Sequence, residues 1–277
     1  EGRTSGERIR VQGHVTEMAP MASDNDKPGA RQQRAASQTE RRMRVSEAQS
    51  MAPKKSRSQA SGAVAESHDS GSVKKRRALG VIVEFNGGNG APSKQAARGA
   101  LFDGADSADG YFRIASGGDG SGGGQLGILP PEGSGKEVVR VELDRNPSSC
   151  NFRGWAGSAK SKAQDKGVDF SKHQHTVYFL EKGPTSQCGW RGLAGLGCRG
   201  GSCFAFVRGS GAHTAGHEIG HNLKLLHTNR EKGNGEVQSY DEWTLMGWRY
   251  DFINPVQREF LGFYDDHPDK VEKVEAG

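Results

Sequence analysis

The stretch that most constrains this chain runs from His217 to His227 and begins with the pattern His-Glu-x-x-His. Two histidines four residues apart lie on the same face of an α-helix, because four residues cover slightly more than one turn. The imidazoles of His217 and His221 can therefore reach one metal ion from the same side. Glu218 is offset by about 100° around the helix and can lean over the open position of that metal, where it would take a proton from water. The pattern predicts a helix that carries a metal site and a general base.

His227 can join this site only if the helix ends before it. In a continuous helix His227 would lie about 9 Å farther along the axis than His221. That is too far for both to bind one zinc ion, whose bonds to nitrogen are about 2.0–2.1 Å long. We therefore expect the helix to end between residues 222 and 226 and the chain to turn back. Three histidine ligands with one open position are typical of catalytic rather than structural zinc.

Other interpretations of these histidines are weaker. His213 lies four residues before His217 and could form a competing pair. However, His213 and His221 would be about 12 Å apart along the helix axis, so one ion cannot reach both. The histidines could also be ordinary surface or core residues of an amphipathic helix. His227 at this spacing, and Met246 farther along the chain, favour the metal site instead.

Charge is distributed unevenly along the 277 residues. Residues 1–78 hold 16 Lys or Arg and 9 Asp or Glu, a net charge of +7, whereas residues 79–277 hold 22 and 24, a net charge of −2; the two sum to +5. The first segment has no aromatic residue and few aliphatic ones, so we predict that it is disordered. Its basic run from Lys74 to Arg77 is open to several interpretations: a nuclear-localisation patch, a nucleic-acid contact, a proprotein cleavage site or simply a solvated charge run.

Four cysteines, Cys150, Cys188, Cys198 and Cys203, fall in the region that we expect to fold. An even number allows two disulfides, as in an oxidising compartment, although the spacing leaves the pairing open and four free thiols are the alternative. No stretch approaches the roughly 18 apolar residues of a membrane span, and no signal-peptide core is visible.

We predict one domain over residues 79–264, followed by a charged tail over 265–277. Strands are expected at 81–85, 136–143 and 176–180, and helices at 93–102 and 155–165. His173 and His175 precede the last of these strands, and we expect them to be loop residues rather than ligands. The glycine-rich stretch 117–124 lacks the strand–turn–helix context of a dinucleotide site, so we interpret it as a flexible loop.

Two later segments complete the expected domain. The run from Phe204 to Val207 could be an edge strand against which an extended substrate pairs. Asn254, Pro255 and Gln257 supply an N-cap, a proline at the first helical position and a capping-box partner. They predict a short helix over residues 255–261.

Taken together, these elements resemble the gametolysin family of metzincins, the algal cell-wall metallopeptidases. The resemblance spans about residues 79–263 and rests on the zinc-type run 217–227, on Cys188-Gly-Trp and the glycines that follow it, on Leu245-Met246-Gly247 and on Asn254-Pro-Val-Gln through Gly262. It implies an α/β (α+β) metzincin-like fold. Such a fold has a mixed twisted sheet, a zinc-binding active-site helix and a small C-terminal subdomain with a Met-turn.

The resemblance also implies roles for individual residues. His217, His221 and His227 would bind zinc, Glu218 would act as general base and acid, and Met246 would form the Met-turn. Lys224 departs from the family pattern, which has glycine there and leaves the helix through a positive φ. A non-glycine residue in that conformation costs roughly 1 kcal/mol or more. Trp248 stands where some metzincins have a tyrosine.

The function that the resemblance implies is that of a secreted zinc-dependent endopeptidase acting on extracellular or cell-wall glycoproteins. One alternative is a catalytically weak or inactive metzincin-like protein that binds zinc or peptide, because Lys224 prevents closure of the site. A second alternative is a nucleic-acid or nuclear interaction protein led by the basic segment.

Overall fold

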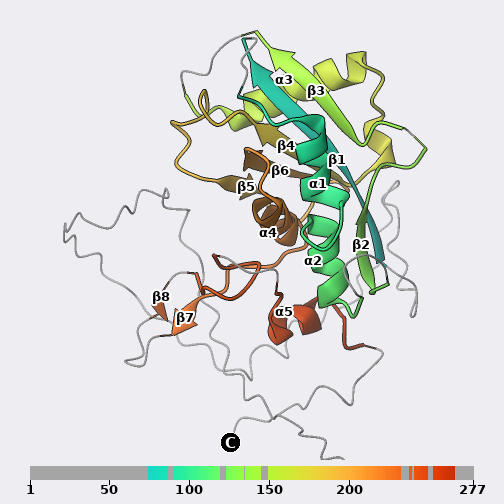
Figure 1. The fold of residues 1–277 in the computed structure, drawn as a ribbon, viewed down its shortest axis with the longest axis vertical. Coiled ribbons are helices and arrows are strands. Elements are labelled where there is room, and N and C mark those ends of the chain that lie inside the picture. The colour runs from blue at the N-terminus through green and yellow to red at the C-terminus, as the bar shows by residue number, and fades with distance from the viewer. Residues whose placement is uncertain are drawn as a thin grey trace, which may run out of the picture. The chain divides into compact units, whose positions relative to one another are not determined.

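A computed structural model describes residues 74–86, 90–118, 123–133, 135–144, 149–231, 237–238, 240–248 and 252–265. All of these lie in one compact unit, Gly62–Lys270. A six-stranded mixed sheet forms its centre, with helices against both faces (Figure 1). The predicted α/β class is confirmed. Among the helices in the described ranges, none has the length and apolar character needed to cross a membrane.

The sheet is built around β1 (Lys74–Phe85). On one side its first residues pair with β2 (Leu126–Leu129) and its later ones with β3 (Val138–Leu143), and on the other side it pairs with β4 (His175–Leu180). These pairings are parallel, as is that of β4 with β6 (Cys203–Arg208). Strand β5 (Gly192–Ala194) joins β6 antiparallel and ends the order β2-β1-β4-β6-β5.

Both faces of the central strands are buried, which is why they are almost continuously apolar. In β4, Val177 and Phe179 face one cluster of core side chains, whereas Tyr178 and Leu180 face the other. The first cluster packs against α1 (Lys94–Phe102), α2 (Ala108–Ala115) and α4 (Ala212–Asn222), and the second packs against α3 (Phe152–Asp165). A ribbon of β7 (Arg230–Glu231) and β8 (Val237–Gln238) and the helix α5 (Pro255–Phe260) follow.

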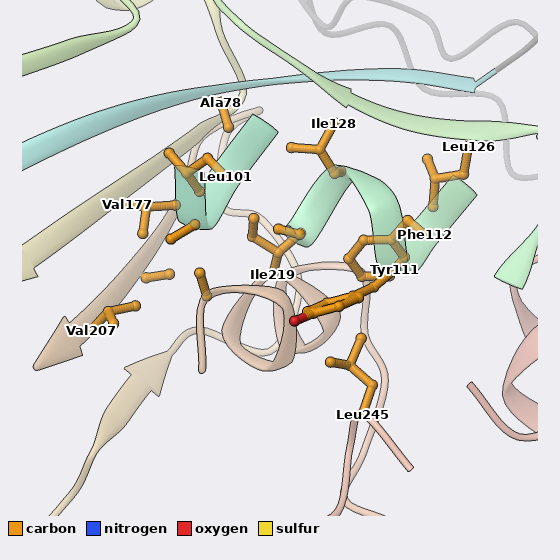
Figure 2. Close-up of a cluster of buried hydrophobic side chains, with 14 of the residues drawn as sticks. Ala78, Leu101, Tyr111, Phe112, Leu126, Ile128, Val177, Val207, Ile219 and Leu245 are labelled. Atoms are coloured by element: carbon orange, nitrogen blue, oxygen red, sulfur yellow. The ribbon is translucent and has the colours of Figure 1, made fainter. Parts of the chain in front are cut away.

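Helix α4 is anchored in the first cluster (Figure 2). Ile219 points from α4 toward α1 and α2, and the ring of Tyr111 reaches from α2 to α4, next to Leu245. Gly216 permits this approach, because a Cβ there would lie 2.9 Å from the Tyr111 ring and 3.2 Å from the Leu245 side chain. The helix that carries the predicted metal site is therefore fixed by large buried side chains on its other face.

Most predicted elements are confirmed within one to three residues at their boundaries. The N-cap at Asn254 is confirmed too, since its side chain accepts a hydrogen bond from the Gln257 amide at 2.8 Å. Residues 108–115, for which we predicted no element, form α2. The described part of the glycine-rich stretch 117–124 is irregular.

The predicted start of the folded region was wrong by five residues. The basic run from Lys74 to Arg77, which we placed in the disordered segment, is the beginning of β1 and pairs with β2. It tolerates its charge because the side chains lie at the end of the sheet, where Arg77 bonds the Pro130 carbonyl at 2.9 Å and pairs with Glu132 at 3.2 Å. The predicted disorder of the remainder and the charged tail beyond residue 265 lie outside the described residues.

Two expectations about strands were also wrong. Phe204 to Val207 belong to β6, which lies between β4 and β5, so the edge on this side of the sheet is β5. His175 is the first residue of β4 and is buried, and it is therefore not a loop residue. Sequence periodicity could not detect β5, because its three residues lie in a glycine-rich stretch without alternation.

Candidate metal centre

Helix α4 ends within the interval that binding of one metal ion by His217, His221 and His227 requires. Leu223 is its C-cap, and Lys224 has a φ of 69°, in the left-handed region. The Lys224 amide donates to the His221 carbonyl at 2.8 Å, and the Leu225 amide donates to the Gly220 carbonyl at 2.9 Å. These two bonds form a Schellman motif, in which the left-handed residue is usually glycine. The predicted helix end between residues 222 and 226 is confirmed.

The loop that follows β5 supports this turn. The Gly197 amide donates to the His221 carbonyl at 2.9 Å, and the stem of Lys224 lies over Gly197. The Asn222 side chain donates to the carbonyls of Gly195 and Phe204, both at 3.0 Å. These contacts are absent from an isolated helix, and they offset the cost of about 1 kcal/mol that a lysine incurs at positive φ.

Two disulfides are present among the described residues, as the even cysteine count allowed. Cys150 pairs with Cys188, and Cys198 pairs with Cys203. The second disulfide closes the segment between β5 and β6 that bonds to the end of α4. It therefore fixes the support of the turn at Lys224.

The turn brings His227 back to the two histidines of α4. Its Nε2 lies 3.0 Å from Nε2 of His221 and 3.1 Å from Nε2 of His217. The candidate ligand atoms of the three residues all lie within 4.8 Å of one another, and the group could hold a metal ion. Two nitrogens bound to a tetrahedral zinc at 2.0–2.1 Å would be about 3.3 Å apart, so the donor set fits such an ion.

Backbone carbonyls orient two of the imidazoles. Nδ1 of His217 lies 2.7 Å from the Leu245 carbonyl, and Nδ1 of His221 lies 2.8 Å from the Leu225 carbonyl. Because a carbonyl only accepts, each Nδ1 carries the proton and each Nε2 presents its lone pair to the centre. Metal-binding histidines in proteins are commonly held in this way.

Burial keeps the three imidazoles neutral. It lowers the pKa of His217 to about 3 and that of His227 to about 4, with the neighbouring imidazoles adding to the effect. The pKa of His221 is also lowered by burial, against the opposing effect of its carbonyl bond. Neutral imidazole is the form that binds metals, so no proton has to be displaced at pH 7.

Glu218 directly follows His217 on α4, and its side chain is buried. Burial raises its pKa well above the usual value, and its Oε2 has no hydrogen-bond partner. An unpaired buried oxygen of this kind requires a ligand or water to satisfy it. Gly192 of β5 lies against this carboxyl group, since a Cβ at Gly192 would collide with it.

Residues near the C-terminus complete the surroundings of His227. Met246 is fully buried, and its sulfur packs against Gly220 of α4. The Thr228 amide donates to the Met246 carbonyl at 3.1 Å. Gln257 donates from Nε2 to the Leu226 carbonyl at 2.8 Å. The residues before and after His227 are thus both held by the C-terminal part of the domain.

Several of these positions were not apparent from the sequence. Gln257 appeared to be a capping-box partner, whereas its side chain bonds the chain next to His227. Asn222 directly follows the second histidine, but nothing local indicates its distant partners. His213, the competing candidate, lies one turn before His217 with its ring centroid 6.1 Å away and is not part of the triad.

A family comparison covers this part of the chain. Residues 132–265 match the gametolysin peptidase M11 family model. The resemblance to the gametolysin family is confirmed. The gametolysin match extends from the residues before β3 to the end of α5, so it includes the His-Glu-x-x-His helix, the turn at Lys224, His227 and Met246.

The other comparisons are more distant. No curated protein matches the chain significantly. Among solved structures, the crystal structure of metalloproteinase-II from Bacteroides fragilis is similar, with 16% identity and a TM-score of 0.38. The match covers 73% of this chain and 54% of that one, so this chain spans about half the length of that protein.

Proposed function

We propose that this chain is a zinc-dependent endopeptidase that hydrolyses peptide bonds of extracellular or cell-wall proteins. The observation that carries the proposal is the convergence of three neutral imidazole nitrogens, accompanied by a buried, unpaired carboxyl oxygen on Glu218, the residue that follows His217 in α4. The match to a peptidase family over the same residues supports it. The extracellular setting is supported by the two disulfides, which form and persist in oxidising compartments.

His217, His221 and His227 would hold the zinc ion through their Nε2 atoms. When bound, zinc supplies the Lewis acidity that activates water and polarises the scissile carbonyl. Glu218 takes a proton from the attacking water and returns it to the leaving amine. Burial raises the pKa of the Glu218 carboxyl group, and a bound cation nearby would lower it again and so favour the carboxylate, which is the form that accepts the proton.

The test uses the full chain loaded with zinc and a casein or gelatin substrate. We expect about one zinc per chain, proteolysis that a chelator abolishes, and restoration by added zinc. Glu218→Gln should retain zinc but lose proteolysis by a factor of at least about 10². His227→Ala should lose both zinc and proteolysis. Unchanged proteolysis in Glu218→Gln would overturn the assignment of the general base.

The alternative of a catalytically weak binding protein depends on Lys224. In the structure Lys224 adopts the left-handed conformation that the glycine of the family provides, and His227 lies with the other two histidines. These observations favour the enzyme. A gain in turnover of more than about tenfold in Lys224→Gly would favour the alternative, because it would mean that the native turn holds His227 away from its working position.

A further inference from the structure

Arg191 and Trp248 form a contact beside the candidate metal centre that the catalytic proposal does not use. The Arg191 guanidinium lies over the Trp248 ring, 5.7 Å from the ring centroid, within the range of a cation–π interaction. Arg191 directly precedes β5, whereas Trp248 lies two residues after Met246. The contact therefore joins the sheet to the segment that contains the Met-turn.

Two independent sets of contacts connect Arg191 and Trp248 to the residues of the candidate metal centre. Gly192, the neighbour of Arg191 in the chain, touches the Glu218 carboxyl group. In the second set, the Trp248 ring lies 5.9 Å from that of Tyr240, and the Tyr240 ring lies 4.4 Å from the imidazole of His227. An extended peptide advances about 3.3–3.6 Å per residue. The two ring-to-ring steps from His227 to Trp248 together equal about three residues of extended chain, so we expect side chains within about three residues of the scissile bond to reach this contact.

The side chain of Arg191 is accessible to an anionic group of a ligand. Arg191 is exposed and Trp248 is 47% exposed. Within the described part of the chain, no carboxylate lies at ion-pair distance from Arg191. Its backbone is fixed, because its carbonyl accepts from the Arg208 amide at 2.9 Å. A guanidinium that lies over an indole face keeps N–H groups available, and these match the two oxygens of a carboxylate.

We infer that Arg191 and Trp248 form a subsite that binds an acidic side chain of the peptide substrate, one to three residues from the scissile bond. Arg191 supplies the paired N–H donors, and Trp248 positions the guanidinium. The inference rests on the proposed peptidase function and adds a substrate class to it. This chain prefers peptides with Asp or Glu near the cleaved bond over peptides with the uncharged amide there.

The test compares pairs of fluorogenic peptides that differ only by Glu or Gln at each of the three positions on either side of the cleaved bond. The zinc-loaded full chain should show a kcat/KM ratio of Glu to Gln peptide of roughly two to five at one or two positions, the range for an exposed ion pair. The ratio should fall as salt is raised. Arg191→Gln should bring it to about one, and Arg191→Glu should bring it below one, because a glutamate at the subsite repels the Glu peptide.

Three further variants distinguish the subsite from general surface charge. Trp248→Phe should retain most of the preference, whereas Trp248→Leu should reduce it, because only an aromatic ring stacks under the guanidinium. Arg199, an exposed arginine beyond β5, serves as the matched control, and Arg199→Gln should leave the ratio unchanged. A ratio of one at every position in the native chain, or a preference that persists in Arg191→Gln, overturns the inference.

Failure of the proposed function would look different. In that case no peptide is cleaved, and the affinities of the Glu and Gln peptides for the zinc-loaded Glu218→Gln chain are compared instead. A ratio of dissociation constants that depends on Arg191 supports the subsite even without hydrolysis. Equal affinities of the two peptides overturn it.

Discussion

Replacement of Asn222 by alanine should damage both the stability of the domain and its metal site. Asn222 is buried at the end of α4, and its side chain makes three hydrogen bonds. Its amide nitrogen donates to the carbonyls of Gly195 and Phe204 at 3.0 Å, and its oxygen lies 3.2 Å from Nδ1 of His175. The residue thus connects the helix that carries two of the candidate ligands to β4, β6 and the loop after β5.

The size of the effect follows from these contacts. A hydrogen bond contributes about 0.5–1.5 kcal/mol net, and a buried group left without its partner costs about 1–3 kcal/mol. Because the alanine variant leaves the imidazole of His175 and two carbonyls short of a partner, we expect a loss of about 3 kcal/mol in the free energy of unfolding. The turn after residue 222 should loosen as well, lowering zinc affinity by roughly tenfold, as for residues that orient metal ligands indirectly.

Asn151→Ala is the matched control. Asn151 is the N-cap of α3 and accepts one exposed hydrogen bond from the Gly154 amide at 3.1 Å. Its replacement should cost about 1 kcal/mol and leave zinc affinity unchanged. Unfolding in urea with a chelator present measures the stabilities, and competition with a chromogenic chelator measures the affinities. Equal destabilisation of the two variants, together with equal zinc affinity, would refute the reasoning.

Three other perturbations have defined outcomes. Lys224→Gly should change the free energy of unfolding by less than about 1 kcal/mol in urea, because relief at positive φ is offset by the greater freedom of glycine in the unfolded chain; a loss above 2 kcal/mol would contradict this. Gln257→Leu removes the bond to the Leu226 carbonyl next to the third histidine and should weaken zinc binding more than it lowers the urea midpoint. Burial lowers the pKa of His175 to about 4, so the unfolded chain binds the extra proton between pH 6.5 and 4, and the metal-free protein should lose stability as pH falls through that window. The three triad histidines, whose pKa values are also lowered by burial, act in the same direction. Glu218, with its raised pKa, acts in the opposite direction, so the pH series is run on Glu218→Gln, and a flat profile would count against the burial of these histidines.

Part of the candidate site could be predicted from local sequence pattern, and part depends on contacts between residues distant in sequence. His217, Glu218 and His221 could be placed together from the sequence, because a helix fixes the relation of residues one and four positions apart. The requirement that the helix end before His227 also followed from distance alone. The sequence did not show whether a lysine could occupy the turn, because that depends on contacts with Gly197 and its neighbours, which are distant in sequence.

The sequence by itself determined the helix with its histidines and glutamate, the buried strands β1 and β4, the short helix after Asn254 and the likeness to the gametolysin family. Each of these is expressed in spacing over a few residues, within the reach of a single helix or strand. Only the tertiary structure decided the cysteine pairing, the position of β5 at the sheet edge, and the bonds of Asn222 and Gln257 that hold the triad. Those features depend on strand register and on loops closed over tens of residues, where no local periodicity specifies the partner.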